Sequence, residues 1–145
     1  MEIKELLRGV ELFDGLDEHG LKEVAEICTR RQLKYGELLV KQGEIGRELF
    51  IVSEGLMEVA VSDQTAQRVV VNLGTGQLIG EMSLVDRGPR SATVKAIQDP
   101  TYVQVIQHDE FHSLCERNTQ IGYQVMLNLA IDLSFKLRHH NLSED

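Results

Sequence analysis

Residues 79–94 decide how the rest of the chain is interpreted, and they read Ile79-Gly80-Glu81-Met82-Ser83-Leu84-Val85-Asp86-Arg87-Gly88-Pro89-Arg90-Ser91-Ala92-Thr93-Val94. Gly80 allows the backbone to come close to a neighbouring group, because it has no Cβ atom. Residues 81–86 can form one short helical turn, whose first N–H groups lack a partner in the turn and can bind an anion. The Gly-Pro pair at 88–89 then turns the chain back, and we expect Arg90 at the start of the next strand.

The charged residues of this stretch indicate what kind of ligand it suits. The fork of Arg90 matches phosphate oxygens, and Ser91 can donate one more hydrogen bond. Glu81 is unfavourable beside an anion unless it accepts hydrogen bonds from hydroxyl groups of the same ligand. A ribose phosphate satisfies both demands, so the stretch predicts a site for such a group.

Outside this stretch, the glycines mark a region rich in turns. Eight of the 12 glycines lie between residues 36 and 88. Short β-prone runs separate them or follow them, and several alternate apolar and polar residues. These runs are residues 38–40, 49–52, 57–61, 68–73, 91–97 and 101–106. The pattern predicts an antiparallel sandwich or barrel.

The flanks of this region carry helical spacing instead. Residues 2–8 and 16–29 precede it, and residues 109–116 and 120–138 follow it. The apolar stripe of the last helix is widened by further apolar residues, so this helix should pack on two things at once. The stripe and its extensions are Ile121, Val125, Leu129, Leu133, Met126, Ala130 and Leu137. We therefore expect one domain over residues 1–145, with helices at about 2–29, a β-roll at about 30–107 and helices at about 108–138.

Composition excludes several classes of function. Lys and Arg number 15 against 23 Asp and Glu, a net charge of −8, which argues against coating of nucleic acid but not against one small anion. No apolar run exceeds four residues, so neither a membrane span nor a signal-peptide core is expected. Cys28 and Cys115 are too few for a disulfide framework, which favours a reducing cytoplasm.

The quoted stretch resembles the phosphate-binding cassette of cyclic nucleotide-binding domains, as in catabolite-activator-type regulators and regulatory subunits of cAMP-dependent kinase. That cassette reads Gly-Glu, a few apolar or small residues, a short loop, then Arg-Ser/Thr/Ala-Ala. The upstream glycine pattern is also similar, with Tyr35-Gly36-Glu37, Gln42-Gly43-Glu44, Gly46, Leu49-Phe50-Ile51-Val52 and Gly55. The resemblance covers about residues 8–138. It implies a mainly β fold, an antiparallel β-roll (double-stranded jelly roll) with N-terminal helices and a C-terminal helix pair.

The resemblance also implies roles for individual residues. Glu81 would accept the ribose 2′-hydroxyl, and Arg90 would pair with the cyclic phosphate. Gly80 would leave room for the ribose. The phosphate cradle would be completed by Ser91 and by the N–H groups of Met82 and Ser83, with Ala92 closing the motif. The base would contact strand residues and a cap from the last helix, for which we name Val59, Val71, Leu73, Leu133 and Lys136.

Together these features predict a regulatory module that binds cAMP, with cGMP left open, and that signals by moving its C-terminal helix. The broad apolar face of this helix would contact an unidentified protein partner or a second copy of the chain. Only residues 139–145 follow the expected end of that helix, so no helix-turn-helix and no nucleic acid partner is expected, and the short apolar runs give no reason to expect a membrane partner. No further cofactor, metal site or catalytic constellation is expected, so the chain is predicted not to be an enzyme.

The alternative is a protein-interaction domain of the same fold with a degenerate, nucleotide-free site. In that case Arg90 would pair with Glu81 in an empty site, and Ser83 would be a small core residue. Val59, Val71 and Leu73 are core strand residues under either interpretation. Cys28 and Cys115 are expected to be packed as small apolar residues.

Overall fold

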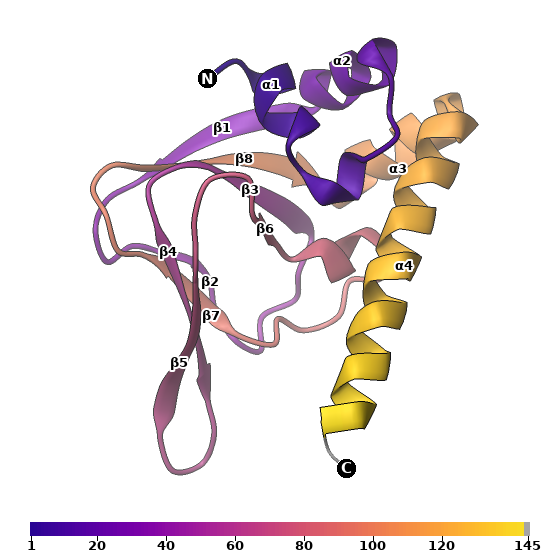
Figure 1. Ribbon diagram of the computed structural model, residues 1–145. Helices are drawn as coiled ribbons and strands as arrows, with labels where there is room; N and C mark the ends of the chain where they lie inside the picture. Colours follow the sequence, from indigo (N-terminus) through magenta and orange to yellow (C-terminus); the bar gives the residue numbers. More distant parts are fainter. Residues whose placement is uncertain (144–145) are drawn as a thin grey trace.

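The β-prone runs pair into two antiparallel sheets in the computed structural model, which describes residues 1–143 (Figure 1). The strands are β1 (Cys28–Leu33), β2 (Leu38–Val40), β3 (Glu48–Glu54), β4 (Met57–Ser62), β5 (Gln67–Leu73), β6 (Leu78–Ile79), β7 (Thr93–Ala96) and β8 (Thr101–Gln107). One sheet has the order β1-β8-β3-β6, and the other has the order β2-β7-β4-β5. The expected mainly β fold with flanking helices is therefore confirmed.

Strand β3 is buried on both faces, which explains the continuous apolar run at residues 49–52. Leu49 and Ile51 belong to a core cluster shared with the helices, whereas Phe50 and Val52 belong to the cluster enclosed by the two sheets. Successive side chains of a strand point to opposite faces, so one strand can supply both cores. The roll and the helices consequently share β3 as a common wall.

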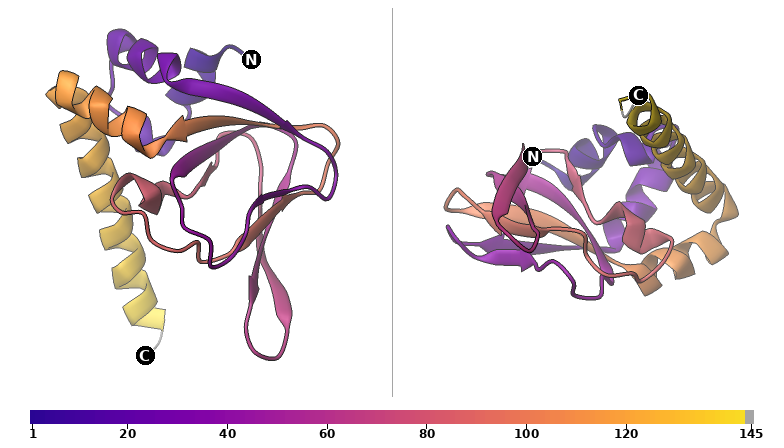
Figure 2. Two further views of the ribbon diagram at one scale, coloured as in Figure 1. Left: turned by 180° about the vertical axis from the view of Figure 1, so that it is seen from behind. Right: turned by 90° about the horizontal axis from the view of Figure 1, so that it is seen from below.

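The helices gather on one side of the roll, while the β4–β5 hairpin projects away from the body (Figure 2). They are α1 (Ile3–Arg8), η1 (Glu11–Phe13), α2 (Glu18–Glu26), α3 (His108–Arg117) and α4 (Thr119–Ser143). Asp17 caps the start of α2, where its carboxylate accepts a hydrogen bond from the N–H of Gly20 at 2.8 Å. No helix within residues 1–143 is long and apolar enough to cross a membrane.

The first helical region ends earlier than the sequence pattern predicted. Cys28 and Thr29 were placed in the helix of residues 16–29, but α2 ends at Glu26 and both residues lie in β1. The side chain of Cys28 nevertheless packs against the helical core cluster. Its place on the apolar stripe was therefore a sign of which core it joins, not of its backbone conformation.

The last helix is longer than predicted and has two different halves. It runs to Ser143 instead of residue 138, and residues 144–145 of the expected domain lie outside the described residues. Its first half is buried through Ile121, Val125 and Leu129. There the side-chain amide of Asn128 also donates hydrogen bonds to the carbonyls of Leu12 (2.9 Å) and Asp14 (2.7 Å). This part of α4 is thus fixed to the N-terminal turn, which comprises η1 and Asp14.

The second half of α4 carries exposed apolar side chains. Ile131 and Phe135 are each 59% exposed, and Leu137, which the sequence pattern placed on the buried side, is 62% exposed. Tyr123 and Leu127 extend the row of Ile131 and Phe135 back along the helix at four-residue intervals. The expectation that this helix is apolar on more than one face is confirmed.

Candidate functional site

The predicted short helical turn follows β6 and forms a 3₁₀ turn, η2 (Glu81–Leu84). It begins at Gly80, whose φ of +83° lies in the left-handed region that favours glycine. The N–H of Ser83 donates to the carbonyl of Gly80 at 2.9 Å and closes the turn. Within residues 1–143, no backbone carbonyl outside the turn accepts from the N–H of Glu81 or Met82, so both remain available to an anion.

Arg90 is attached to a neighbouring loop through its backbone. Its N–H donates to the carbonyl of Glu44 at 2.7 Å, and its own carbonyl accepts from the N–H of Gly43 at 2.9 Å. The N–H of Gly46 donates to the carbonyl of Gly88 at 3.0 Å, which adds a third bond between the two loops. The glycine-rich segment at 43–46 therefore holds the segment that carries the arginine.

The side chain of Arg90 reaches under the turn. Nη1 donates to the hydroxyl of Ser83 at 2.9 Å, and Nη2 donates to the carbonyl of Glu48 at 2.8 Å. The guanidinium carbon lies 5.6 Å from the centre of the buried Phe50 ring. A guanidinium has five N–H donors, so three remain for a ligand after these two bonds.

Two glycines are required by the course of this side chain. A Cβ atom on Gly46 would lie 2.8 Å from the Cζ and Nε atoms of Arg90 and 2.9 Å from the Ser83 hydroxyl. A Cβ atom on Gly80 would collide with Nη1 of Arg90. We expected Gly80 to leave room for a ribose, and in the structure the guanidinium occupies the space beside it.

The partial burial of Arg90 affects its charge. Burial lowers the pKa of the Arg90 guanidinium from its usual value, and the carboxylate of Glu48 acts in the opposite direction. That carboxylate itself accepts from Nη2 of Arg31 (3.1 Å) and Nε2 of Gln107 (3.0 Å). The site thus holds one partly dehydrated cation beside free N–H groups, as an anion site requires.

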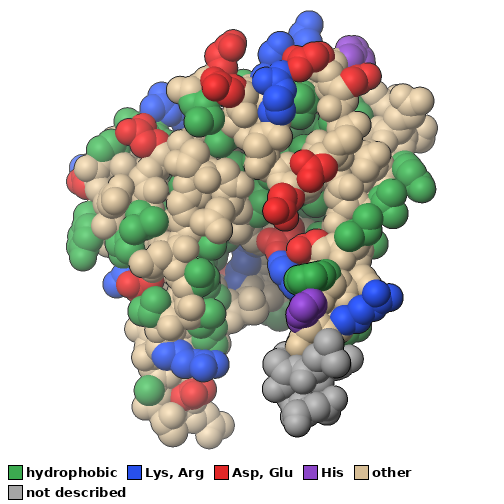
Figure 3. All heavy atoms as spheres, viewed as in Figure 1, with side chains coloured by type: hydrophobic (Ala, Val, Ile, Leu, Met, Phe, Trp, Pro, Cys, Tyr) green, Lys and Arg blue, Asp and Glu red, His purple; other side chains and the backbone are tan. Residues whose placement is uncertain are grey.

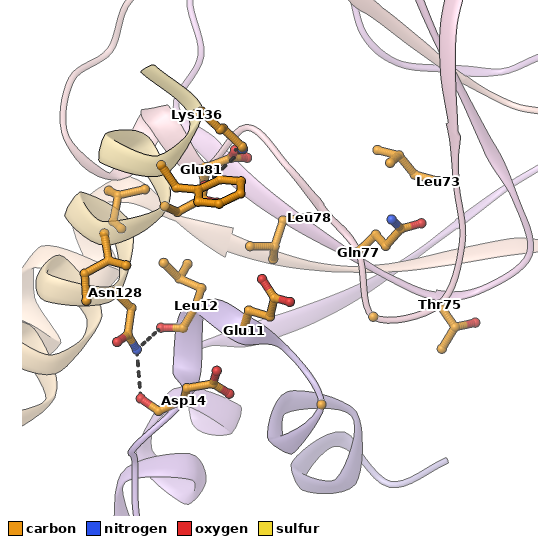
Figure 4. A pocket seen from close by; sticks show the side chains of 16 residues that line it. Glu11, Leu12, Asp14, Leu73, Thr75, Gln77, Leu78, Glu81, Asn128 and Lys136 are labelled. Atoms are coloured by element: carbon orange, nitrogen blue, oxygen red, sulfur yellow. Dashed lines mark hydrogen bonds and ion pairs between the residues drawn. The ribbon is translucent and has the colours of Figure 1, made fainter. Parts of the chain in front are cut away.

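Glu81 has a partner from the last helix (Figure 4). Nζ of Lys136 lies 3.4 Å from Oε1 of Glu81 and 2.9 Å from Oδ2 of Asp132. Burial alone would lower the pKa of Lys136, but the hydrogen bond to Asp132 and the charge of Glu81 outweigh it and raise this pKa. The expected cap residue therefore reaches the expected ribose acceptor in the structure.

A cavity of about 940 Å³ opens between the roll, the N-terminal turn and α4. Its walls include Leu73, Leu78, Glu81, Phe135 and Lys136, whereas Arg90 and Ser83 are not among its lining residues. Figure 3 shows acidic side chains gathered in the hollow where the roll meets α4. Glu81 and Lys136 thus face one cavity, whose lining does not include Arg90 or Ser83.

The strand residues named for base contact lie on one face. Val59 and Val71 are direct cross-strand partners, and Leu73 lies two residues beyond Val71. Val59 and Leu73 pack against the core of the roll, which identifies this face as the inner one. Val71 is 44% exposed, so the expectation that it is a core residue is wrong. Leu133, by contrast, packs against the helical core cluster.

Two expectations for the cassette need correction. The N–H of Ser83 is not free, because it closes the turn. Arg90 lies in the loop before β7 and not at the start of the strand, because its backbone bonds to residues 43–44. The exposed hydroxyl of Ser91 has no hydrogen-bond partner within residues 1–143, which is compatible with its predicted donor role, and Ala92 is half-buried.

Sequence reasoning missed three parts of the site. The carbonyl of Glu48 and the ring of Phe50 hold Arg90, and Gly46 gives it space. A backbone carbonyl cannot be recognised from a sequence. The spacing of Gly43 and Gly46, by contrast, could have predicted a close approach of the chain at this loop. Within the described part of the chain, no group of three or more His, Cys, Asp or Glu residues could hold a metal ion.

Comparison with known proteins supports a ligand-binding site. Residues 30–118 match the family described as the cyclic nucleotide-binding domain. The chain is 31% identical over 140 residues to the cyclic AMP receptor protein of Thermus thermophilus, covering 96% of this chain and 62% of that protein. The chain thus spans less than two thirds of this relative. The matched family is one of binding domains, in agreement with the expectation that the chain is not an enzyme.

Two solved structures show the same fold. The Thermus thermophilus catabolite activator protein superimposes with a TM-score of 0.83 at 31% identity, over 93% of this chain and 62% of that one. The regulatory domain of Toxoplasma gondii PKA, crystallised with cAMP, gives a TM-score of 0.71 at 28% identity, over 77% of this chain and 42% of that one.

The close fit around Arg90 leads to a testable expectation. In Gly46→Ala the new methyl group displaces the guanidinium from Ser83, which should lower the free energy of unfolding by about 1–3 kcal/mol. Gly74→Ala is the matched control, because a Cβ atom there meets only Leu56 Cδ1 at 3.9 Å. Urea denaturation of both variants gives the comparison. Equal stabilities for Gly46→Ala and wild type would show that Arg90 does not depend on this gap.

Proposed function

The chain belongs to the cyclic nucleotide-binding domain family, and from this premise we propose that it is a regulatory module whose ligand is cAMP. The observation that carries the proposal is the Arg90 guanidinium beside the free N–H groups of η2. The choice of cAMP over cGMP is supported by the relatives described as a cyclic AMP receptor protein and as a regulatory domain solved with cAMP. No other cofactor is part of the proposal.

The proposed binding mode uses the groups that remain free. The cyclic phosphate would take the unused donors of Arg90, the N–H groups of Glu81 and Met82, and the exposed hydroxyl of Ser91. The ribose hydroxyl would bind the carboxylate of Glu81. The base would extend along the inner face of β4 and β5 at Val59, Val71 and Leu73, towards Lys136.

We propose that the signal is a shift in the second half of α4. The first half is fixed by its buried stripe and by Asn128, whereas the second half reaches the cassette through the ion pair of Lys136 with Glu81. A ribose on Glu81 changes this contact. A ligand shifts such an equilibrium only by its differential affinity for the two states, and Glu81 is where the two states would differ.

One observation favours the alternative of a nucleotide-free interaction domain. Arg90 and Glu81 both already have partners in the protein, Ser83 and Lys136. The simplest form of a degenerate site would pair Arg90 with Glu81. The structure shows no such pair within residues 1–143. The two hypotheses are separated by direct titration.

The first test is a ligand panel followed by melting temperature. Wild-type protein is titrated with cAMP, cGMP and a cyclic dinucleotide. A ligand at a hundred times its Kd stabilises the folded state by about 2.7 kcal/mol, so cAMP should raise Tm by about 5–10 °C. No shift with any ligand at millimolar concentration would favour the interaction domain.

The second test compares two cations of the site. Arg90→Ala should weaken cAMP binding about tenfold to hundredfold, because a charged hydrogen-bond donor to the phosphate is lost. Lys136→Ala should change the affinity by less than about fivefold, since its ion pairs are exposed. Isothermal titration calorimetry measures both. Equal affinities for wild type and Arg90→Ala would disprove the phosphate role.

The partner that we propose is a second copy of the chain, in a cytoplasmic setting. Its support is the exposed row of Tyr123, Leu127, Ile131 and Phe135, which is longer than scattered surface residues would produce. Such a row is self-complementary across a two-fold axis. The free thiols of Cys28 and Cys115 agree with a reducing compartment.

Light scattering after size exclusion, with and without cAMP, measures the assembly. We expect a dimer that Ile131→Glu converts to a monomer, because a charge is placed in the apolar row. Gln120→Glu, an exposed change in the first turn of α4, is the control and should remain dimeric. A monomeric wild type under both conditions would exclude the dimer.

A further inference from the structure

The C-terminal end of η2, the turn proposed to bind the phosphate, is held by α3, a helix to which no functional role has been assigned so far. The N-terminal end of η2 faces the anion site, but the carbonyls at its C-terminal end also need partners. Met82 O accepts from the N–H groups of Val85 (3.0 Å) and Asp86 (3.1 Å). Leu84 O accepts from Nε2 of His112 on α3, at 2.7 Å.

This hydrogen bond joins parts of the chain that are 28 residues apart. A carbonyl oxygen only accepts, so Nε2 of His112 carries the proton. The side chain of Leu84 is fully buried and that of His112 is half-buried, so water is a poor substitute for this bond. The position of the turn therefore depends on α3.

Two further contacts reinforce the same connection. Arg87, three residues beyond the turn, forms an ion pair with Asp109 of α3. The ring of His108 lies on that of His112, with centres 4.3 Å apart and planes inclined by 36°. His108 and His112 are four residues apart and therefore share one face of α3. That face holds the turn and the loop that follows it.

We propose that His112 is a positioning residue for the phosphate site, an inference that rests on the proposed cyclic nucleotide function. By holding Leu84 O it sets the direction of the N–H groups of Glu81 and Met82, which are within three residues of it on the same turn. Only Asn118 separates α3 from α4. The hydrogen bond thus connects the phosphate site to the base of the proposed signalling helix.

Two substitutions separate hydrogen bonding from packing. His112→Phe keeps a ring that can lie against His108 but removes the donor, whereas His112→Gln keeps an N–H donor and removes the ring. His19→Ala is the control, because His19 is exposed on α2 and contacts Glu23. All three are compared with wild type for cAMP affinity by calorimetry and for amide hydrogen exchange of residues 82–86 without ligand.

We expect His112→Phe to weaken cAMP binding about three- to tenfold, the change that one lost hydrogen bond produces. Exchange at residues 82–86 should accelerate by a similar factor. His112→Gln should restore both quantities, and His19→Ala should change neither. Wild-type affinity and exchange in His112→Phe, or a larger loss in His112→Gln than in His112→Phe, would overturn the proposal. If wild type binds no cyclic nucleotide, the proposed function fails, while the exchange data still decide whether His112 holds the turn.

Discussion

The position of the Arg90 guanidinium is the constraint on which the site depends. It is held between the hydroxyl of Ser83 and the carbonyl of Glu48, close to the ring of Phe50. A group this large and this polar needs both space and acceptors when it is partly buried. Gly46 gives the space, the first residue of β3 gives the carbonyl, and the turn gives the hydroxyl. Turn, loop and strand must therefore assemble together before an anion can be bound, which makes the site a property of the whole roll.

The last helix connects this site to a surface. Its first half is part of the core, and its second half presents one charged contact to the cassette and an apolar row to the outside. Lys136 contacts the carboxylate of Glu81, to which a ribose would also bind, so the ligand and the helix would share one binding partner. In the proposed mechanism, a change at Glu81 would be carried through Lys136 to the exposed apolar residues of α4. Breaking the ion pair of Lys136 with Glu81 should cost little free energy, because an exposed ion pair contributes less than about 1 kcal/mol.

Much of the fold was predictable because its signals are local. Glycine spacing marked the turns, short β-prone runs marked six of the strands, and Gly80, Glu81 and Arg90 marked the site. Strand β1 was missed because four of its six residues are exposed and polar, so it shows no alternation. Strand β6 has two residues, too few for any pattern. The partners of Arg90 and of Leu84 O could not be predicted, since a backbone carbonyl is the same at every residue and only the fold brings it to its donor.

Strand β3 contributes to both hydrophobic cores and to the position of Arg90. It contributes Leu49 and Ile51 to one core, Phe50 and Val52 to the other, and the carbonyl of Glu48 to Arg90. A substitution in β3 therefore disturbs the packing of the helices, the packing of the roll or the position of Arg90, depending on which residue is changed. Exposed residues of the loops and of the second half of α4 belong to neither core, so substitutions there should cost less stability than substitutions in β3.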